Sequence, residues 1–131
     1  ARAPLSYPHW LAVDGAGHLL AADRNNEALG ELYSPLHPAV LRLLQMVIET
    51  GARHRIPVAV CGEMAGDARM TPLLLALGLS EFSLHPGTLL EVRRAIREAD
   101  LGALRARAPK LLAARDRRAI ERWLALVADT P

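Results

Sequence analysis

The sequence feature that most constrains the fold is an alternation of short apolar runs with helical patterns. Two runs, IPVAVC at residues 56–61 and EFSL at residues 81–84, have the length and character of buried strands. Helical spacing of apolar residues occurs before, between and after them, at residues 38–49, 68–77 and 89–99. This order predicts parallel βα units with right-handed crossovers, whose functional sites form at the carboxyl ends of the strands.

The two ends of the chain are expected to differ. After Asp100 only helical patterns remain, at residues 101–108 and 116–127, and Trp123 falls on the apolar stripe of the second. These segments predict packing helices. Near the other end, residues 9–13 (HWLAV) have the pattern of a strand that ends at Asp14.

Composition narrows the class of protein. The 131 residues are 51% hydrophobic, which is enough for one domain with a core. The formal charge is only +2, and the arginines alternate with acids as on solvated helix faces, so we do not expect nucleic-acid binding. A single cysteine excludes an intramolecular disulfide and fits a reducing compartment, so we expect the cytoplasm. The longest apolar run, residues 72–79, is far shorter than the ~20 residues that span a bilayer, so we expect no membrane segment.

Candidate reactive groups follow the two predicted strands. Cys61 ends the first strand and precedes Gly62, which allows another group to approach closely; the thiol is either a proton donor or nucleophile, or a small buried side chain. His85 follows the second strand, as a partner for this cysteine or as a lone surface histidine. For Glu63 and Asp67 we expect capping or salt bridges around the next helix rather than catalysis.

Other residues of the predicted helices are expected to be structural. Gly51 should lie at the C-terminus of the helix that begins near Pro38, and His37 should have a structural role at its start. Met46 is expected to fill the core or a pocket. In the helix at residues 89–99, Leu90 and Val92 should lie on the apolar side, and the exposed side should carry Arg93, Arg94 and Arg97.

Four motifs occur in a specific order along the chain. They are LLAADRNNEAL at residues 19–29, YSPLHPAVLRLL at 33–44, CGEMAGD at 61–67 and LGLSEFSL at 77–84. Together they resemble the C-terminal part of enzyme I, which starts the bacterial phosphoenolpyruvate:sugar phosphotransferase system. The resemblance covers about residues 19–128, while residues 1–18 diverge. It implies an α/β fold in which residues 1–131 form a single partial domain, the C-terminal portion of a TIM (βα)8 barrel with two to three βα units plus terminal helices, because eight units need about 250 residues.

The resemblance also implies roles for three residues. Cys61 matches the catalytic cysteine that protonates the enolate carbon of departing pyruvate, and Arg24 matches the arginine that grips the substrate phosphate. Asp14 is in register with a Mg²⁺-binding aspartate of the family motif GTND, but Val13 replaces the asparagine of that motif. Since a hard cation needs several oxygen ligands, we expect that this chain alone does not complete the Mg²⁺ site.

The implied function is phosphoryl transfer from phosphoenolpyruvate to a protein histidine. The implied partners are the histidine-containing phosphocarrier protein, received through an N-terminal domain outside these residues, and a second copy of the barrel in a homodimer. We expect the isolated chain to be incomplete for catalysis. The alternative is a non-catalytic truncated paralogue or fragment that serves dimerisation or ligand-dependent regulation, and the loss of the asparagine at Val13 favours it.

Overall fold

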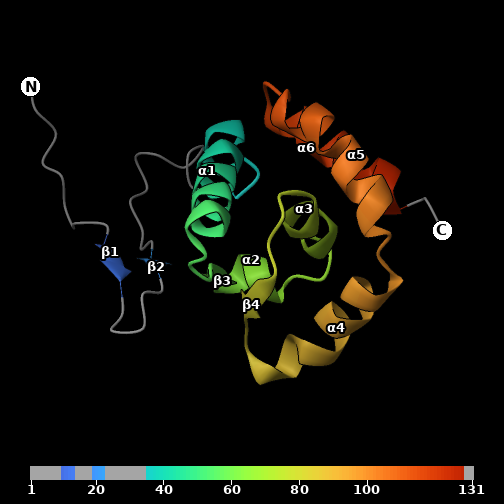
Figure 1. The fold of residues 1–131 in the computed structure, drawn as a ribbon. Helices are drawn as coiled ribbons and strands as arrows, with labels where there is room; N and C mark the ends of the chain where they lie inside the picture. The colour runs from blue at the N-terminus through green and yellow to red at the C-terminus, as the bar shows by residue number, and fades with distance from the viewer. Residues whose placement is uncertain (1–9, 14–18, 23–34, 129–131) are drawn as a thin grey trace, which may run out of the picture.

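The computed structural model describes residues 10–13, 19–22 and 35–128. The strands are β1 (Trp10–Val13), β2 (Leu19–Ala22), β3 (Ala59–Cys61) and β4 (Glu81–Ser83). The helices are α1 (Pro38–His54), α2 (Glu63–Gly66), α3 (Thr71–Ala76), the 3₁₀ turn η2 (Pro86–Thr88), α4 (Leu89–Glu98), α5 (Leu101–Leu112) and α6 (Arg117–Ala128). Most of the described chain is therefore helical (Figure 1).

Two small sheets are present in the described residues. β3 and β4 are parallel, with Ala59 opposite Glu81 and Cys61 opposite Ser83, which confirms the predicted pairing of the two apolar runs. β1 forms an antiparallel pair with β2, so the strand expected at residues 9–13 is found, with a partner that the sequence did not predict. A helical chain with a two-stranded parallel sheet is compatible with an α/β fragment.

The hydrophobic core is centred on α3. Its leucines Leu73 and Leu74 are fully buried, and the helix contacts α4, α5 and α6 (Figure 1). The core cluster also includes Leu41 and Ile48 of α1 and Trp123 of α6. The prediction that Trp123 is a core residue is therefore confirmed, and the C-terminal helices do pack against the βα segment.

Helix α1 is longer than its sequence pattern indicated. Pro38 occupies its first turn and the Nδ1 atom of His37 accepts a hydrogen bond from the backbone N–H of Ala39 at 3.1 Å, which confirms a structural role for this histidine. Gly51 was expected at the C-terminus, but the helix continues to His54 and ends at Arg55 in the left-handed conformation, with φ 59°. Gly51 is instead a buried helical position against the side chain of Val58.

The helix predicted at residues 68–77 is shorter in the structure. It forms α3 at Thr71–Ala76, and a separate single turn, α2, comes before it at Glu63–Gly66. The carboxylate of Asp67 accepts a hydrogen bond from the backbone N–H of Arg69 at 2.9 Å in the connection between them. This local bond supports a turn in place of a continuous helix.

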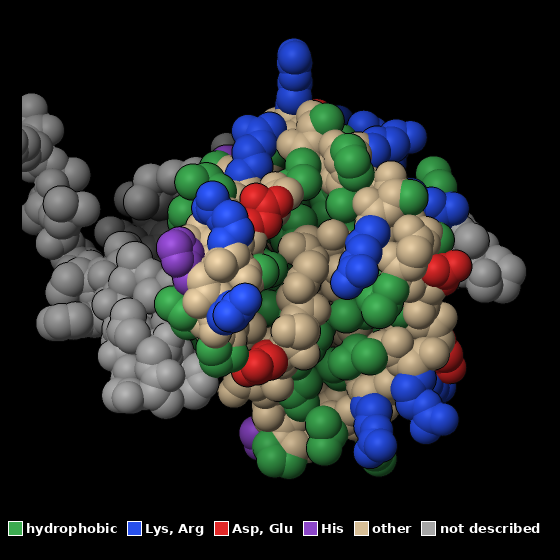
Figure 2. All heavy atoms as spheres, viewed as in Figure 1, with side chains coloured by type: hydrophobic (Ala, Val, Ile, Leu, Met, Phe, Trp, Pro, Cys, Tyr) green, Lys and Arg blue, Asp and Glu red, His purple; other side chains and the backbone are tan. Residues whose placement is uncertain are grey.

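Two predictions of buried side chains are wrong. Leu90 was placed on the inner side of its helix, but it is 78% exposed while Val92 is buried, because residues two apart lie on opposite sides of a helix. Met46 was expected to fill the core and is 63% exposed, since α1 directs Leu41 and Ile48 inward. Arg93, Arg94 and Arg97 of α4 are exposed as expected. Figure 2 shows Lys and Arg side chains spread over one face, with hydrophobic side chains between them.

Among the helices that the structure describes, none is both long enough and apolar enough to cross a membrane.

Candidate functional site

Cys61 lies at the carboxyl end of β3 and is exposed to solvent. Strand β3 supplies its backbone position, and the chain then turns at Gly62, whose φ of 81° is a conformation that favours glycine. A Cβ atom added at Gly62 would meet nothing within 4 Å, so the chain next to Cys61 is not packed against other elements at this position. The predicted location of this residue at a strand end is found, and the alternative of a buried thiol is excluded.

Ser83 lies beside Cys61 at the end of the neighbouring strand. The two residues are in register in the parallel pair, and both are exposed. A thiol and a hydroxyl at one edge of the sheet can donate protons or hydrogen bonds to the same bound molecule. Sequence reasoning did not single out Ser83. The register of AVC against EFS, once the strands are assumed parallel, was the signal that could have found it.

The acidic residues after Cys61 behave as structural groups. Asp67 forms an ion pair with Arg69, with an oxygen–nitrogen distance of 2.7 Å, as expected for capping and salt-bridging acids. The hydrogen bond from the guanidinium group holds the pKa of Asp67 below its ordinary value of 3.8. The same hydrogen bond raises the pKa of Arg69. Glu63 is exposed in the first turn of α2.

His85 follows β4 and caps the turn η2. Its Nδ1 atom accepts a hydrogen bond from the backbone N–H of Gly87 at 3.1 Å, and its carbonyl oxygen accepts one from the hydroxyl of Thr88 at 3.1 Å. His85 is exposed, so it is a surface histidine, and its Nδ1 atom is already occupied by the hydrogen bond from Gly87. Pairing with Cys61 stays a prediction.

The other two predicted site residues, Arg24 and Asp14, lie outside the described residues. Within residues 10–13, 19–22 and 35–128, no group of three or more His, Cys, Asp or Glu side chains is arranged to hold a metal ion.

Comparison with known proteins assigns the segment that contains this site. Residues 14–101 match the family described as PEP-utilising enzyme, PEP-binding domain, where PEP is phosphoenolpyruvate. The chain belongs to this family. The match includes Cys61 and Ser83, and it ends where α5 begins.

Three proteins that are similar to this chain have the same name. Phosphoenolpyruvate-protein phosphotransferase of Cupriavidus necator is 54% identical over 82 residues, which is 63% of this chain and 14% of the relative. The proteins of the same name from Priestia megaterium and Buchnera aphidicola are 48% identical over 81 residues and 39% identical over 95 residues. These alignments cover 62% and 72% of this chain, and 14% and 17% of the relatives. The predicted resemblance to enzyme I is thus confirmed, and the chain spans about one seventh of the length of these relatives.

Proposed function

We propose that this chain is the PEP-binding C-terminal region of a phosphoenolpyruvate-protein phosphotransferase, which transfers the phosphoryl group of PEP to a protein histidine. The observation that carries this proposal is the position of Cys61. It is an exposed thiol at the carboxyl end of a parallel strand, within the residues that match a PEP-binding domain. Functional groups of parallel α/β folds occupy this position.

The chemistry proposed for Cys61 is proton donation. When the phosphorus–oxygen bond of PEP breaks, the phosphoryl group passes to an imidazole nitrogen of the acceptor histidine and the enolate of pyruvate is left. The thiol transfers its proton to the methylene carbon of the enolate, which gives pyruvate and a thiolate. The thiolate then recovers a proton from water. A solvent-exposed thiol can serve in both proton transfers.

The roles proposed for Arg24 and Asp14 rest on the family motif. Arg24 would hold the phosphate of PEP, because a guanidinium group offers a planar fork of donors to phosphate oxygens. Asp14 would provide one carboxylate to Mg²⁺, and further oxygen ligands would have to come from outside this chain.

The remainder of the proposed assembly rests on the resemblance to enzyme I and on the greater length of the relatives. The two βα units would form the C-terminal portion of a TIM barrel whose other strands lie in the rest of the protein. The histidine-containing phosphocarrier protein would reach the acceptor histidine through an N-terminal domain in the cytoplasm. A second copy of the barrel would complete a homodimer.

A second candidate function is ligand-dependent regulation or dimerisation without catalysis. It is favoured by Val13, which stands where the family motif has an asparagine that lines the substrate and metal site. Such a chain could still bind PEP through Arg24 while lacking phosphoryl transfer.

Calorimetric titration of PEP into the purified chain, with and without Mg²⁺, tests binding. We expect saturable heat for the wild-type chain and none for Arg24→Ala. The control variant Arg93→Ala changes an exposed arginine of α4 and should bind like the wild type. The binding proposal is wrong if no sample releases heat, or if Arg24→Ala binds PEP as tightly as Arg93→Ala.

A further inference from the structure

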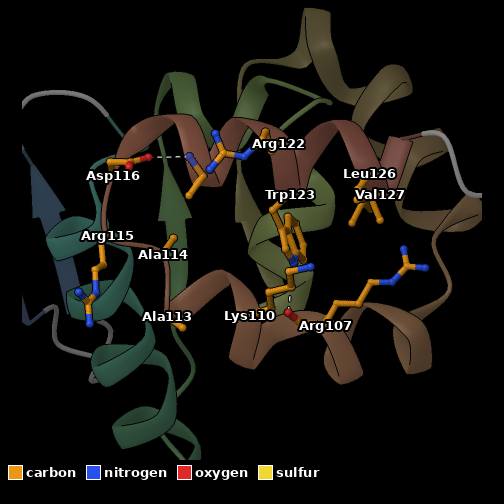
Figure 3. A pocket seen from close by; sticks show the side chains of 11 residues that line it. Arg107, Lys110, Ala113, Ala114, Arg115, Asp116, Arg122, Trp123, Leu126 and Val127 are labelled. Carbon is orange, nitrogen blue, oxygen red and sulfur yellow. Dashed lines mark hydrogen bonds between the residues drawn. The ribbon is translucent and has the colours of Figure 1, made fainter.

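A pocket of about 580 Å³ lies between α5 and α6 (Figure 3). Its lining includes Lys110, Ala113, Arg115, Arg122, Trp123 and Val127. Its volume is within the range of about 300–1,000 Å³ that is typical of small-molecule sites. The lining lies beyond residue 101, where the family match ends, and it does not include Cys61 or Ser83.

The floor of the pocket is apolar and rigidly positioned. Trp123 is only 6% exposed, and its indole N–H donates a hydrogen bond to the carbonyl oxygen of Arg107 at 3.1 Å, which fixes the ring between the two helices. Small alanine side chains and Val127 add apolar surface to the lining. An apolar group bound here would be removed from contact with water, and the core side chains would not have to move.

The rim of the pocket is strongly positive. Lys110, Arg115 and Arg122 are exposed around it, and they come from both helices and from their connection. The lining contains one acid, Asp116, whose carboxylate accepts a hydrogen bond from the backbone N–H of Ala119 at 2.7 Å at the start of α6. One carboxylate engaged in capping leaves an excess of positive charge facing the opening.

We propose that this pocket binds a small carboxylate that has an apolar body, with the apolar part against Trp123 and the carboxylate at the positively charged rim. Both halves of the site are needed for this ligand. An inorganic anion would gain nothing from the apolar floor, and a neutral apolar molecule would gain nothing from the charged rim.

Octanoate is a suitable probe, and octanol is its uncharged counterpart. In a Trp10→Phe background all tryptophan emission comes from Trp123, so binding at the pocket can be followed by fluorescence. We expect a saturable shift of the emission with octanoate and a dissociation constant for octanol at least about fivefold higher, because octanol lacks the charge-assisted contacts. Raising the salt concentration should weaken octanoate binding and leave octanol binding unchanged or stronger.

Variants of the rim and of the wall separate the contribution of the positive charge from that of the apolar space. Lys110→Gln and Arg122→Gln should each raise the dissociation constant of octanoate by about three- to tenfold and leave that of octanol nearly unchanged. Ala113→Leu, at an exposed wall position, should weaken both ligands by filling the space. Arg93→Gln, on α4, is the matched control and should bind octanoate like the parent. Circular dichroism of each variant reports whether the helices are retained.

The proposal is overturned if octanoate causes no saturable shift, if octanol binds as tightly as octanoate, or if Lys110→Gln and Arg122→Gln bind octanoate like Arg93→Gln. If one rim variant loses its helicity, the proposal is tested by the other rim variant and by the comparison of octanoate with octanol.

Discussion

Cys61 and Ser83 face each other in register as the last residues of two parallel strands. Residues in register on adjacent strands point to the same side of a sheet, so the thiol and the hydroxyl share one face of this edge. Both are exposed, and each is followed by a turn. A molecule that binds at the carboxyl end of this sheet therefore meets two proton-bearing groups from separate βα units.

Substrate protection of Cys61 is the first prediction. As the chain has one cysteine, alkylation by iodoacetamide reports on this residue alone, and the exposed thiol should react without denaturant. PEP at about ten times its dissociation constant should slow the reaction about tenfold, because only the unoccupied fraction reacts. Mass spectrometry over time gives both rates. Arg24→Ala should lose the protection and keep the unprotected rate; a rate unaffected by any concentration of PEP would contradict a site at Cys61.

The Asp67–Arg69 ion pair gives a prediction about pH. The folded-state pKa of Asp67 lies below 3.8, so the pair stabilises the fold at all pH values above the ordinary carboxyl pKa. This contribution is lost as the pH falls below about 4 and passes through the folded-state pKa. An NMR titration of the Asp67 carboxyl carbon should show the lowered pKa, and Arg69→Ala should return it toward 3.8.

The matched control for this titration is Arg93→Ala, which removes an arginine from α4 and should leave the pKa of Asp67 unchanged. Because Arg69 is 85% exposed, the loss of stability in Arg69→Ala should be small. An unchanged pKa in Arg69→Ala would show that another group lowers the pKa of Asp67.

The sequence was sufficient to predict the βα segment and the place of Cys61 in it. The β-branched run before Cys61 and the apolar run that ends at Leu84 were predicted as buried strands at residues 56–61 and 81–84. Both runs do form strands, but the strands are shorter, at Ala59–Cys61 and Glu81–Ser83, and their side chains are exposed or only partly buried. The helical spacing between the two runs leaves no room for a hairpin. Parallel pairing follows from that connection. Periodicity and loop length thus carry enough information to predict which residues end the strands.

The burial of individual side chains and the position of the pocket depend on tertiary packing, and the sequence did not predict them. Leu90 and Val92 are both apolar, and only the packing of α4 determines that Val92 is buried while Leu90 faces solvent. The charged pocket between α5 and α6 was also missed, because its rim combines residues from two helices whose relative placement no periodic pattern encodes. Arginines that looked like an ordinary solvated face line a pocket beside a buried tryptophan.

Gly51 gives a prediction about stability. A Cβ atom at this position would overlap the side chain of Val58 and lie 2.9 Å from the carbonyl oxygen of Ile56. Gly51→Ala should therefore lower the free energy of unfolding by about 1–3 kcal/mol, although alanine is the better helix former. Urea denaturation measures the difference. The control is Gly102→Ala in α5, an exposed position where the added atom would lie 3.2 Å from Oδ1 of Asp100, the N-cap of the helix, and would meet no other atom within 4 Å. The free energy of unfolding of this variant should stay within about 1 kcal/mol of the wild type.

Thr71 gives the last prediction, which concerns a buried hydroxyl. The residue is fully buried at the start of α3, and among the described residues its Oγ1 atom has no hydrogen-bond partner. A buried hydroxyl without a partner costs about 1–3 kcal/mol, so Thr71→Val, which keeps the shape, should raise the free energy of unfolding by about 1 kcal/mol. Thr88→Val is the control of opposite sign, since the Thr88 hydroxyl donates to the carbonyl oxygen of His85 at 3.1 Å and its removal should cost about 1 kcal/mol. Urea denaturation of both variants measures the change in the free energy of unfolding, and so shows whether each hydroxyl destabilises or stabilises the fold. If Thr71→Val is destabilised like Thr88→Val, the Thr71 hydroxyl has a partner in solution, and the start of α3 is held by a polar contact as well as by apolar packing.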